Sequence, residues 1–129
     1  MPNVHRYHVR PGPLPVYNPA NHEGTENRRL IGPDNVGASR MEVVLGVLAP
    51  GGGALPHAHP GLEQACYLLE GAARVEIAGE VFTMAPGDMC FFPEDQAHVF
   101  AVTSETPAKV LVIYSPPYLE DPGRVARAP

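Results

Sequence analysis

The sequence has no tryptophan, only two cysteines and few basic residues, and each shortage narrows what the protein can be. Without tryptophan it lacks the usual stacking platform for sugar rings, so a polysaccharide partner is not expected. Lys and Arg number 9 against 14 Asp and Glu, a net charge of −5. Because no basic run is longer than Arg28-Arg29, we expect no nucleic-acid partner.

The two cysteines, Cys66 and Cys90, allow at most one disulfide, and each lies within an apolar run. A buried thiol behaves as a small apolar side chain, so we expect both to be free core residues. No stretch approaches the roughly 18 consecutive apolar residues of a membrane helix, and the N-terminus lacks the apolar segment of a signal peptide. We therefore expect a cytoplasmic protein without membrane contact.

Turn-forming residues are abundant, with 16 Pro and 13 Gly among 129 residues. Between them lie short apolar runs, and no window keeps a helical period for three turns. Short runs at spacings of about ten residues, bounded by turn signals, predict an all-β sandwich or barrel. The predicted strands cover residues 41–49, 65–69, 73–78, 81–85, 89–92, 99–102 and 109–114.

Two turns stand on either side of the strand predicted near residues 74–77. The sequences Glu70-Gly71 and Ala78-Gly79-Glu80 predict a hairpin at each end of that strand. Farther upstream, charged residues at positions 40 and 42 begin a strand, and we expect them on an exposed, salt-linked face.

The chain divides into three segments: an N-terminal arm with edge strands at residues 1–38, a barrel at 39–115, and a C-terminal strap or tail at 116–129. The arm carries apolar residues but has no partner strand of its own, and its prolines prevent a helix. We expect it to add to the sheet edge of a second copy and form a homodimer. The alternative is that the arm wraps its own barrel.

Histidines form the most informative pattern in the chain. His57 and His59 flank a single residue, and side chains at i and i+2 of an extended chain project from the same face. His98 follows about forty residues later, directly before an apolar strand. Neutral imidazole is a common ligand of Zn, Fe, Ni and Cu, and three such groups with open coordination positions make a reactive metal site.

The other histidines, His5, His8 and His22, lie in the arm, and we expect them at the surface. An arm folded over the mouth of the barrel would instead bring His22 near the metal.

The spacing around the three barrel histidines resembles the two motifs of the cupin family. Gly51 is followed after five residues by His57-Ala58-His59, and Gly71 closes this first block. In the second block, Gly87 is followed after five residues by a proline, and His98 ends the block. The resemblance extends over residues 41–114. It implies a double-stranded β-helix, or jelly roll, in which His57, His59 and His98 bind one divalent metal ion, whether Zn, Fe, Mn or Ni.

A fourth ligand is implied by the same resemblance, and two adjacent residues compete for the role. The family usually has a glutamate separated by six residues from the glycine that closes the first motif, and this position is Gln64 here. Counting from His59 instead selects Glu63. On a strand, Gln64 and Glu63 point to opposite faces, and both faces are apolar enough to be buried. We favour Gln64, because we expect the hairpin at Gly71 to fix the register of its strand.

This ligand set indicates the chemistry. Three neutral imidazoles and an amide leave a divalent ion its full charge, which makes it a strong Lewis acid. We therefore expect an isomerase, cyclase, lyase or hydrolase acting on a small oxygenated molecule. A dioxygenase with three histidine ligands and a non-catalytic ligand-binding or sensing protein remain alternatives. No catalytic acid or base stands out.

The wall of the substrate pocket follows from strand phase. Side chains that share a face with Gln64 or with His98 should line the pocket and make it mostly apolar. These residues are Cys66, Leu68, Phe100 and Val102.

Overall fold

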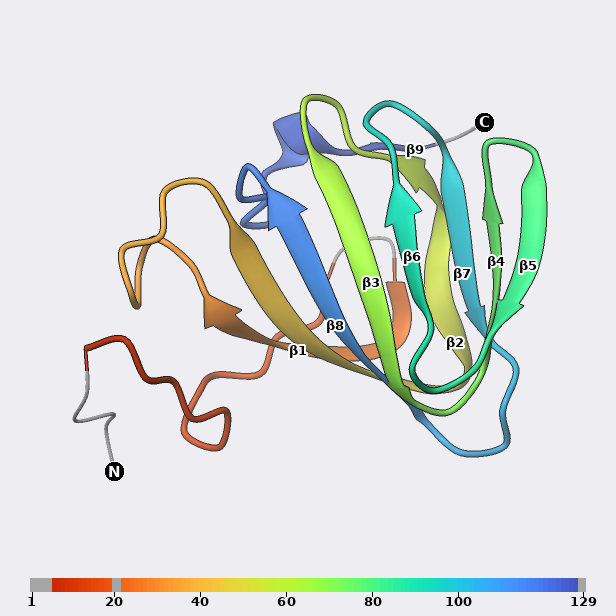
Figure 1. Ribbon diagram of the computed structural model, residues 1–129, viewed down its shortest axis with the longest axis horizontal. Coiled ribbons are helices and arrows are strands. Elements are labelled where there is room, and N and C mark those ends of the chain that lie inside the picture. The colour runs from red at the N-terminus through yellow and green to blue at the C-terminus, as the bar shows by residue number, and fades with distance from the viewer. Residues whose placement is uncertain (1–5, 20–21, 128–129) are drawn as a thin grey trace.

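The computed structural model describes residues 6–19 and 22–127, and its regular structure is almost entirely β-strand (Figure 1). Within those residues no helix is long and apolar enough to cross a membrane. The elements in chain order are β1 (His22–Ile31), β2 (Glu42–Ala58), β3 (Glu63–Glu70), β4 (Ala73–Ile77), β5 (Glu80–Met84), β6 (Met89–Phe92), β7 (His98–Val102), β8 (Ala108–Ser115), the 3-10 turn η1 (Pro122–Arg124) and β9 (Ala126–Arg127).

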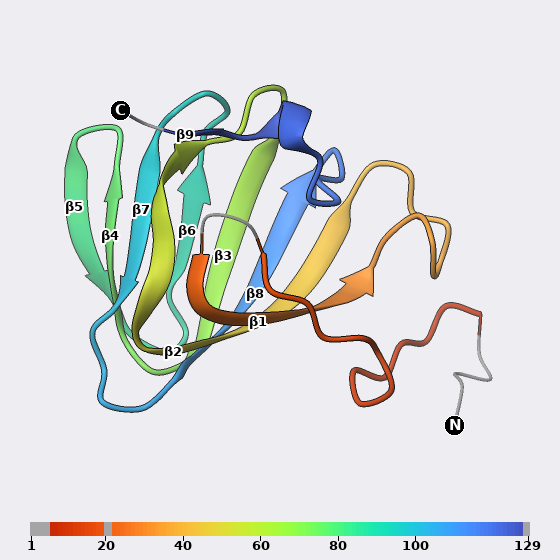
Figure 2. The same cartoon turned by 180° about the vertical axis from the view of Figure 1, so that it is seen from behind.

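These strands form one antiparallel sheet that curls into a nearly closed barrel, as the sequence predicts. The strand order is β5-β4-β7-β2-β8-β3-β6, with β1 and β9 also paired to β2. The long β2 joins two layers, because its residues 42–48 pair with β8 and its residues 53–57 pair with β7. Figures 1 and 2 show β2 passing from the layer that holds β8 and β3 to the layer that holds β7 and β4.

Alternation of buried and exposed residues explains how the two layers make one core. Along β3, Cys66 and Leu68 point inward, and along β7 Phe100 and Val102 do the same. These side chains belong to a single buried cluster that draws on both layers. Fully burying one large apolar side chain stabilises a fold by about 1.5–3 kcal/mol, so this shared interior holds the layers together.

One of the two predicted hairpins is wrong. β4 and β5 do form a hairpin, across a turn in which Ala78 and Gly79 have φ of 51° and 81°. In contrast, β3 pairs with β6 and β8, so the chain crosses from one layer to the other at Gly71. A turn residue signals a change of chain direction but does not specify which strand will lie alongside.

Strands near both ends of the chain, β1 and β9, pair with β2. Residues 22–27, which the sequence assigns to the arm, belong to β1 and pair with β2 of the same chain. Ahead of β1, Tyr17 and Asn27 exchange backbone hydrogen bonds of 2.9 and 2.8 Å. At the other end, β9 pairs with the last residues of β2, so the C-terminal segment lies over the same end of the barrel as the histidines (Figure 2).

Of the two charged residues expected on an exposed face at the start of β2, Arg40 is exposed, whereas the prediction for Glu42 is wrong. Glu42 is only 1% exposed, and its carboxylate is paired with Arg29 of β1. The same carboxylate accepts hydrogen bonds from the backbone N–H groups of Tyr118 and Leu119, at 3.1 and 3.0 Å. Glu42 is buried because it satisfies partners from both ends of the chain, and a single sequence does not reveal such long-range partners.

Candidate metal centre

Three buried imidazoles converge at one end of the barrel. His57 stands near the end of β2, His59 directly follows that strand, and His98 begins β7. One ring nitrogen from each lies within 4.8 Å of the others. The ring centroids of His57 and His98 are 4.5 Å apart, and those of His57 and His59 are 4.8 Å apart. The sequence predicted this grouping.

His57 of β2 and His98 of β7 are cross-strand partners, so the close approach of the two strands brings them together. Gly53, four residues earlier, has φ of 148°, and a Cβ atom there would lie 2.0 Å from the carbonyl oxygen of Phe100. Only glycine fits at this approach. The strand predicted from the sequence ends at residue 49, whereas β2 continues through the glycines to Ala58.

Neighbouring groups hold two of the imidazoles. The Phe92 ring stacks on His98 with 4.1 Å between centroids. The Nδ1 atom of His59 lies 2.8 Å from the backbone carbonyl oxygen of Arg124 in η1. Because a carbonyl oxygen only accepts hydrogen bonds, Nδ1 carries the proton and Nε2 keeps its lone pair for another partner.

Gln64 and Glu63 lie on opposite sides of β3. Gln64 is 9% exposed and lines the cavity beside the histidines, whereas Glu63 is exposed to solvent. The Gln64 Oε1 atom is buried without a hydrogen-bond partner. An unpaired buried oxygen costs free energy unless a ligand or ion satisfies it. The geometry thus favours Gln64 over Glu63, although metal binding by Gln64 stays a prediction.

Burial keeps two of these imidazoles, His59 and His98, neutral near pH 7. Desolvation lowers the pKa of His59 to about 4, although its hydrogen bond to Arg124 opposes the shift. Desolvation, reinforced by the neighbouring imidazoles, lowers the pKa of His98 to about 3. Neutral imidazole is the form that binds a metal, so neither of these two side chains has to lose a proton at neutral pH.

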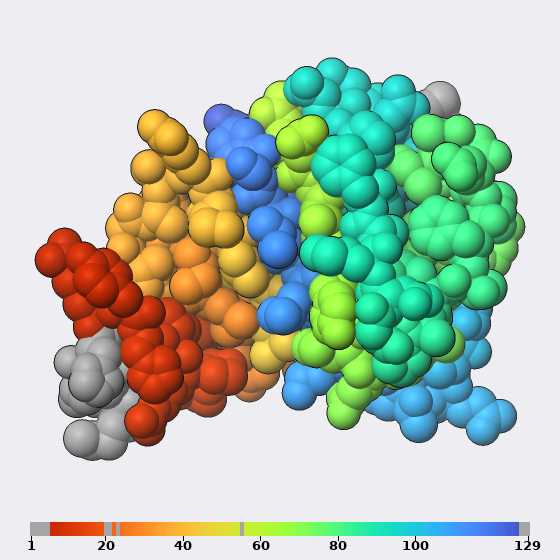
Figure 3. All heavy atoms as spheres, in the orientation of Figure 1, coloured from red at the N-terminus to blue at the C-terminus, as the bar shows by residue number. Residues whose placement is uncertain are grey.

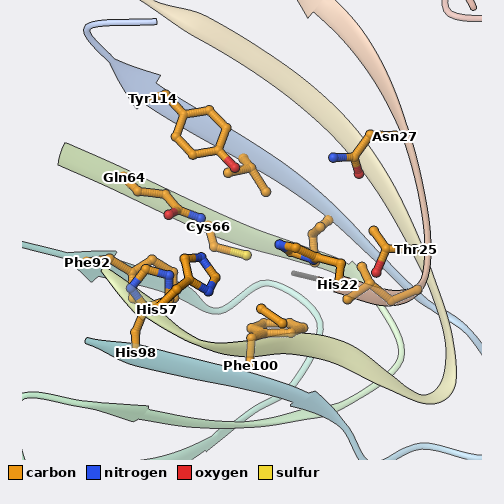
Figure 4. Close-up of a pocket in the computed structure, with 14 residues that line it drawn as sticks. His22, Thr25, Asn27, His57, Gln64, Cys66, Phe92, His98, Phe100 and Tyr114 are labelled. Atoms are coloured by element: carbon orange, nitrogen blue, oxygen red, sulfur yellow. The ribbon is translucent and has the colours of Figure 1, made fainter. Parts of the chain in front are cut away.

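A cavity lined by His57 and His98, but not by His59, extends into the barrel (Figure 4). Its volume is about 40 Å³, and since one water needs about 10–15 Å³, the cavity has room for about three waters. Of the four residues predicted to line a substrate pocket, Cys66 and Phe100 line this cavity, whereas Leu68 and Val102 are buried in the core and are not among its lining residues. The other apolar lining residues are Leu48, Ala54, Phe92, Val110 and Val112.

The polar part of this wall is not predicted from the sequence. His22, Thr25 and Asn27 of β1 line the cavity, and Tyr114 of β8 lines it as well. His22 is not at the surface, the position we favour from the sequence; its ring centroid lies 5.8 Å from that of His57, as in the alternative of a folded arm. His8 is exposed as expected, and His5 lies outside the described residues. In β1 the exposed Glu26 separates the buried Thr25 and Asn27, but all three residues are polar, so the sequence shows no hydrophobic alternation there.

Comparisons with known proteins agree with this geometry. Residues 44–114 match the family model described as a cupin domain. The polyketide synthase CurC of Streptomyces cyaneus is 30% identical over 98 residues, which cover 76% of this chain and 64% of that protein. The chain therefore spans just under two thirds of the length of that relative.

Two solved structures share the fold and about a quarter of the sequence. The polyketide cyclase RemF from Streptomyces resistomycificus is 26% identical, with a TM-score of 0.70 over 91% of this chain and 80% of that chain. A sugar phosphate isomerase of the cupin superfamily from Silicibacter pomeroyi is 27% identical, with a TM-score of 0.71 over 84% of this chain and 74% of that chain.

Proposed function

Because this chain belongs to the cupin family, we propose that it is a metal-dependent enzyme acting on a small oxygenated organic molecule. The observation that carries the proposal is the convergence of His57, His59 and His98 beside the unpaired amide oxygen of Gln64. These four side chains would hold a divalent ion such as Zn, Fe, Mn or Ni.

The candidate metal ligands support non-oxidative chemistry. Among the described residues, no carboxylate joins the group of three histidines. When bound, a divalent ion would therefore keep its full charge and supply Lewis acidity to a substrate carbonyl. The names of the two structural relatives, a cyclase and an isomerase, describe reactions of this redox-neutral kind.

The protein's own residues set the size and surroundings of the substrate. The small cavity favours a compact substrate, because a polycyclic molecule would require the barrel to widen. Phe100 and Leu48 form an apolar wall that displaces water from the reacting groups. Burial raises the pKa of Tyr114 well above its usual value, so its hydroxyl stays protonated and is able to donate a hydrogen bond.

A dioxygenase is the second candidate, because three imidazoles without a carboxylate also suit a metal that activates oxygen. A protein that binds a ligand without converting it is the third. The three candidates predict different results for turnover, oxygen uptake and ligand binding in the same sample.

The test begins with metal analysis of protein purified without added metal, together with the His98→Ala variant. Both proteins are then screened with small keto acids, hydroxy acids and diketones while substrate loss and oxygen uptake are followed. We expect metal-dependent turnover without oxygen uptake, lost on chelation and absent from the variant. Iron with oxygen uptake would favour the dioxygenase, and ligand binding without turnover would favour the binding protein.

A further inference from the structure

Strand β1 supplies a polar wall to the cavity from outside the region that matches the cupin model. His22, Thr25 and Asn27 all line the cavity, whereas the matched region begins at residue 44. In Figure 4 the His22 side chain points from β1 toward His57 and His98, and the other two residues lie farther from the histidines. The candidate metal centre and this wall therefore face the same enclosed space.

His22 has an unmet hydrogen-bonding group. Its Nδ1 atom is buried without a partner, and its ring lies beside that of His57. Because an unpartnered buried nitrogen costs free energy, such groups in folded proteins usually face a ligand or water. An apolar substrate at this position would leave the nitrogen unsatisfied, whereas a hydroxyl or carbonyl would satisfy it.

Asn27 is placed in the wall by two neighbours. Its cross-strand partner is Gly46, where a Cβ atom would come within 2.9 Å of the Asn27 side-chain oxygen. The glycine thus leaves the space that this amide occupies. The backbone of Asn27 also exchanges hydrogen bonds of 2.9 and 2.8 Å with that of Tyr17, which fixes its position and leaves the side-chain amide for other partners.

We propose that His22 and Asn27 form a second substrate-binding wall. This wall selects compact carbonyl compounds that carry a further hydroxyl or carbonyl group, within a few bonds of the substrate oxygen that binds the metal. This inference rests on the proposed function, because it requires the substrate to bind the metal with its other end. The inference implies a more polar substrate than the apolar pocket predicted from the sequence would favour. The specificity would then come from β1 and not from the part of the barrel that matches the family model.

The test uses two probes that bind zinc through the same group and differ at one position. Propionohydroxamic acid lacks a distal hydroxyl, and 3-hydroxypropionohydroxamic acid carries one. Dissociation constants are measured by calorimetry for the zinc-loaded parent and for the His22→Leu and Asn27→Leu variants. Glu26→Gln, an exposed change on the same strand, is the matched control. Zinc content and thermal unfolding are recorded for every sample.

We expect the parent and Glu26→Gln to bind the hydroxylated probe about fivefold more tightly, the effect of one net hydrogen bond. That preference should fall to about one in the His22 and Asn27 variants, with binding of propionohydroxamic acid nearly unchanged. Equal affinities in the parent, or a preference that survives in both variants, would overturn the inference while leaving the proposed function intact. A parent protein that holds no zinc would overturn both.

Discussion

The imidazole of His59 is held by the backbone of Arg124, with 2.8 Å between Nδ1 and the carbonyl oxygen. The segment that carries Arg124 is in turn fixed by Glu42, whose buried carboxylate accepts the N–H groups of Tyr118 and Leu119. The Tyr118 ring also packs on His59, with 4.8 Å between centroids. Thus the C-terminal segment orients one of the candidate metal ligands.

Glu42→Gln should weaken metal binding although residue 42 is not a candidate ligand. The change removes the charged acceptor of the C-terminal segment, and we expect a loss of about 1–3 kcal/mol in the free energy of unfolding. Metal affinity should fall about tenfold, because groups that orient a ligand commonly have effects of this size. Titration with Co²⁺, followed by its visible spectrum, measures affinity and geometry together.

The control for this change is Glu76→Gln, since Glu76 forms an ion pair with Arg74 on the surface. It should leave the spectrum and the affinity unchanged. If Glu42→Gln lowers stability but gives the parental spectrum and affinity, the C-terminal segment only stabilises the fold.

Replacing His98 or His59 with Ala should remove most of the bound metal. Because the ligands act together, we expect each single change to cause a loss well above one quarter of the metal content. Elemental analysis after gel filtration measures this. His8→Ala, an exposed histidine of the arm, is the matched control and should keep the parental content. Normal metal content in a His59→Ala, His98→Ala double variant would mean that the ion binds elsewhere.

Gln64→Ala should lower metal affinity more than Glu63→Ala does. The Gln64 amide faces the cavity and has an unpaired oxygen, whereas Glu63 is exposed on the opposite face of β3. The two variants are adjacent in sequence and serve as controls for each other. A larger loss of affinity for Glu63→Ala would make Glu63 the ligand. Its carboxylate would then reduce the charge of the site, and the argument for a strong Lewis acid would fail.

The metal-free protein should lose stability as pH falls from 7 to 5. Burial lowers the pKa of His59 and of His22 to about 4, and that of His98 to about 3, against 6.5 for an exposed imidazole. The unfolded chain therefore binds protons in this window while the folded chain does not, so the free energy of unfolding decreases as pH falls.

Thermal unfolding in a chelator at several pH values tests this dependence. The stabilisation should be fully present above pH 6.5, and a His98→Leu variant should show a shallower slope. A parental unfolding temperature that stays constant from pH 7 to 5 would contradict neutral, buried imidazoles.

The homodimer predicted from the sequence should depend on the residues ahead of β1. Residues 22–27 pair within the chain, so only the earlier part of the arm is available for a second copy. In Figure 3 this arm, in red, lies at one side of the molecule beside β1. Light scattering of the full chain should give a dimer, and a form lacking residues 1–16 should give a monomer.

The exposed Met89 and Phe91 on the outer face of β6 provide the competing interface. A truncated protein that stays dimeric, but becomes monomeric when Phe91 is replaced by Lys, would assign the dimer to that face. A monomeric full-length protein would refute the dimer itself.

The sequence by itself determined the features that depend on local spacing. Alternation along a strand put His57 and His59 on one face, and it separated Gln64 from Glu63. The turn at Ala78 and Gly79 fixed one hairpin because both residues adopt positive φ. Such features follow from the chain's own geometry and need no knowledge of distant neighbours.

Only the tertiary structure decided which distant residues meet. The burial of Glu42, the position of His22 in the cavity and the contact between His59 and Arg124 all join segments far apart in sequence. A polar side chain is buried only where such partners or a shared cavity compensate for its lost hydration. Whether they do depends on the pairing of β1 and β9 with β2, which turn and strand patterns leave open.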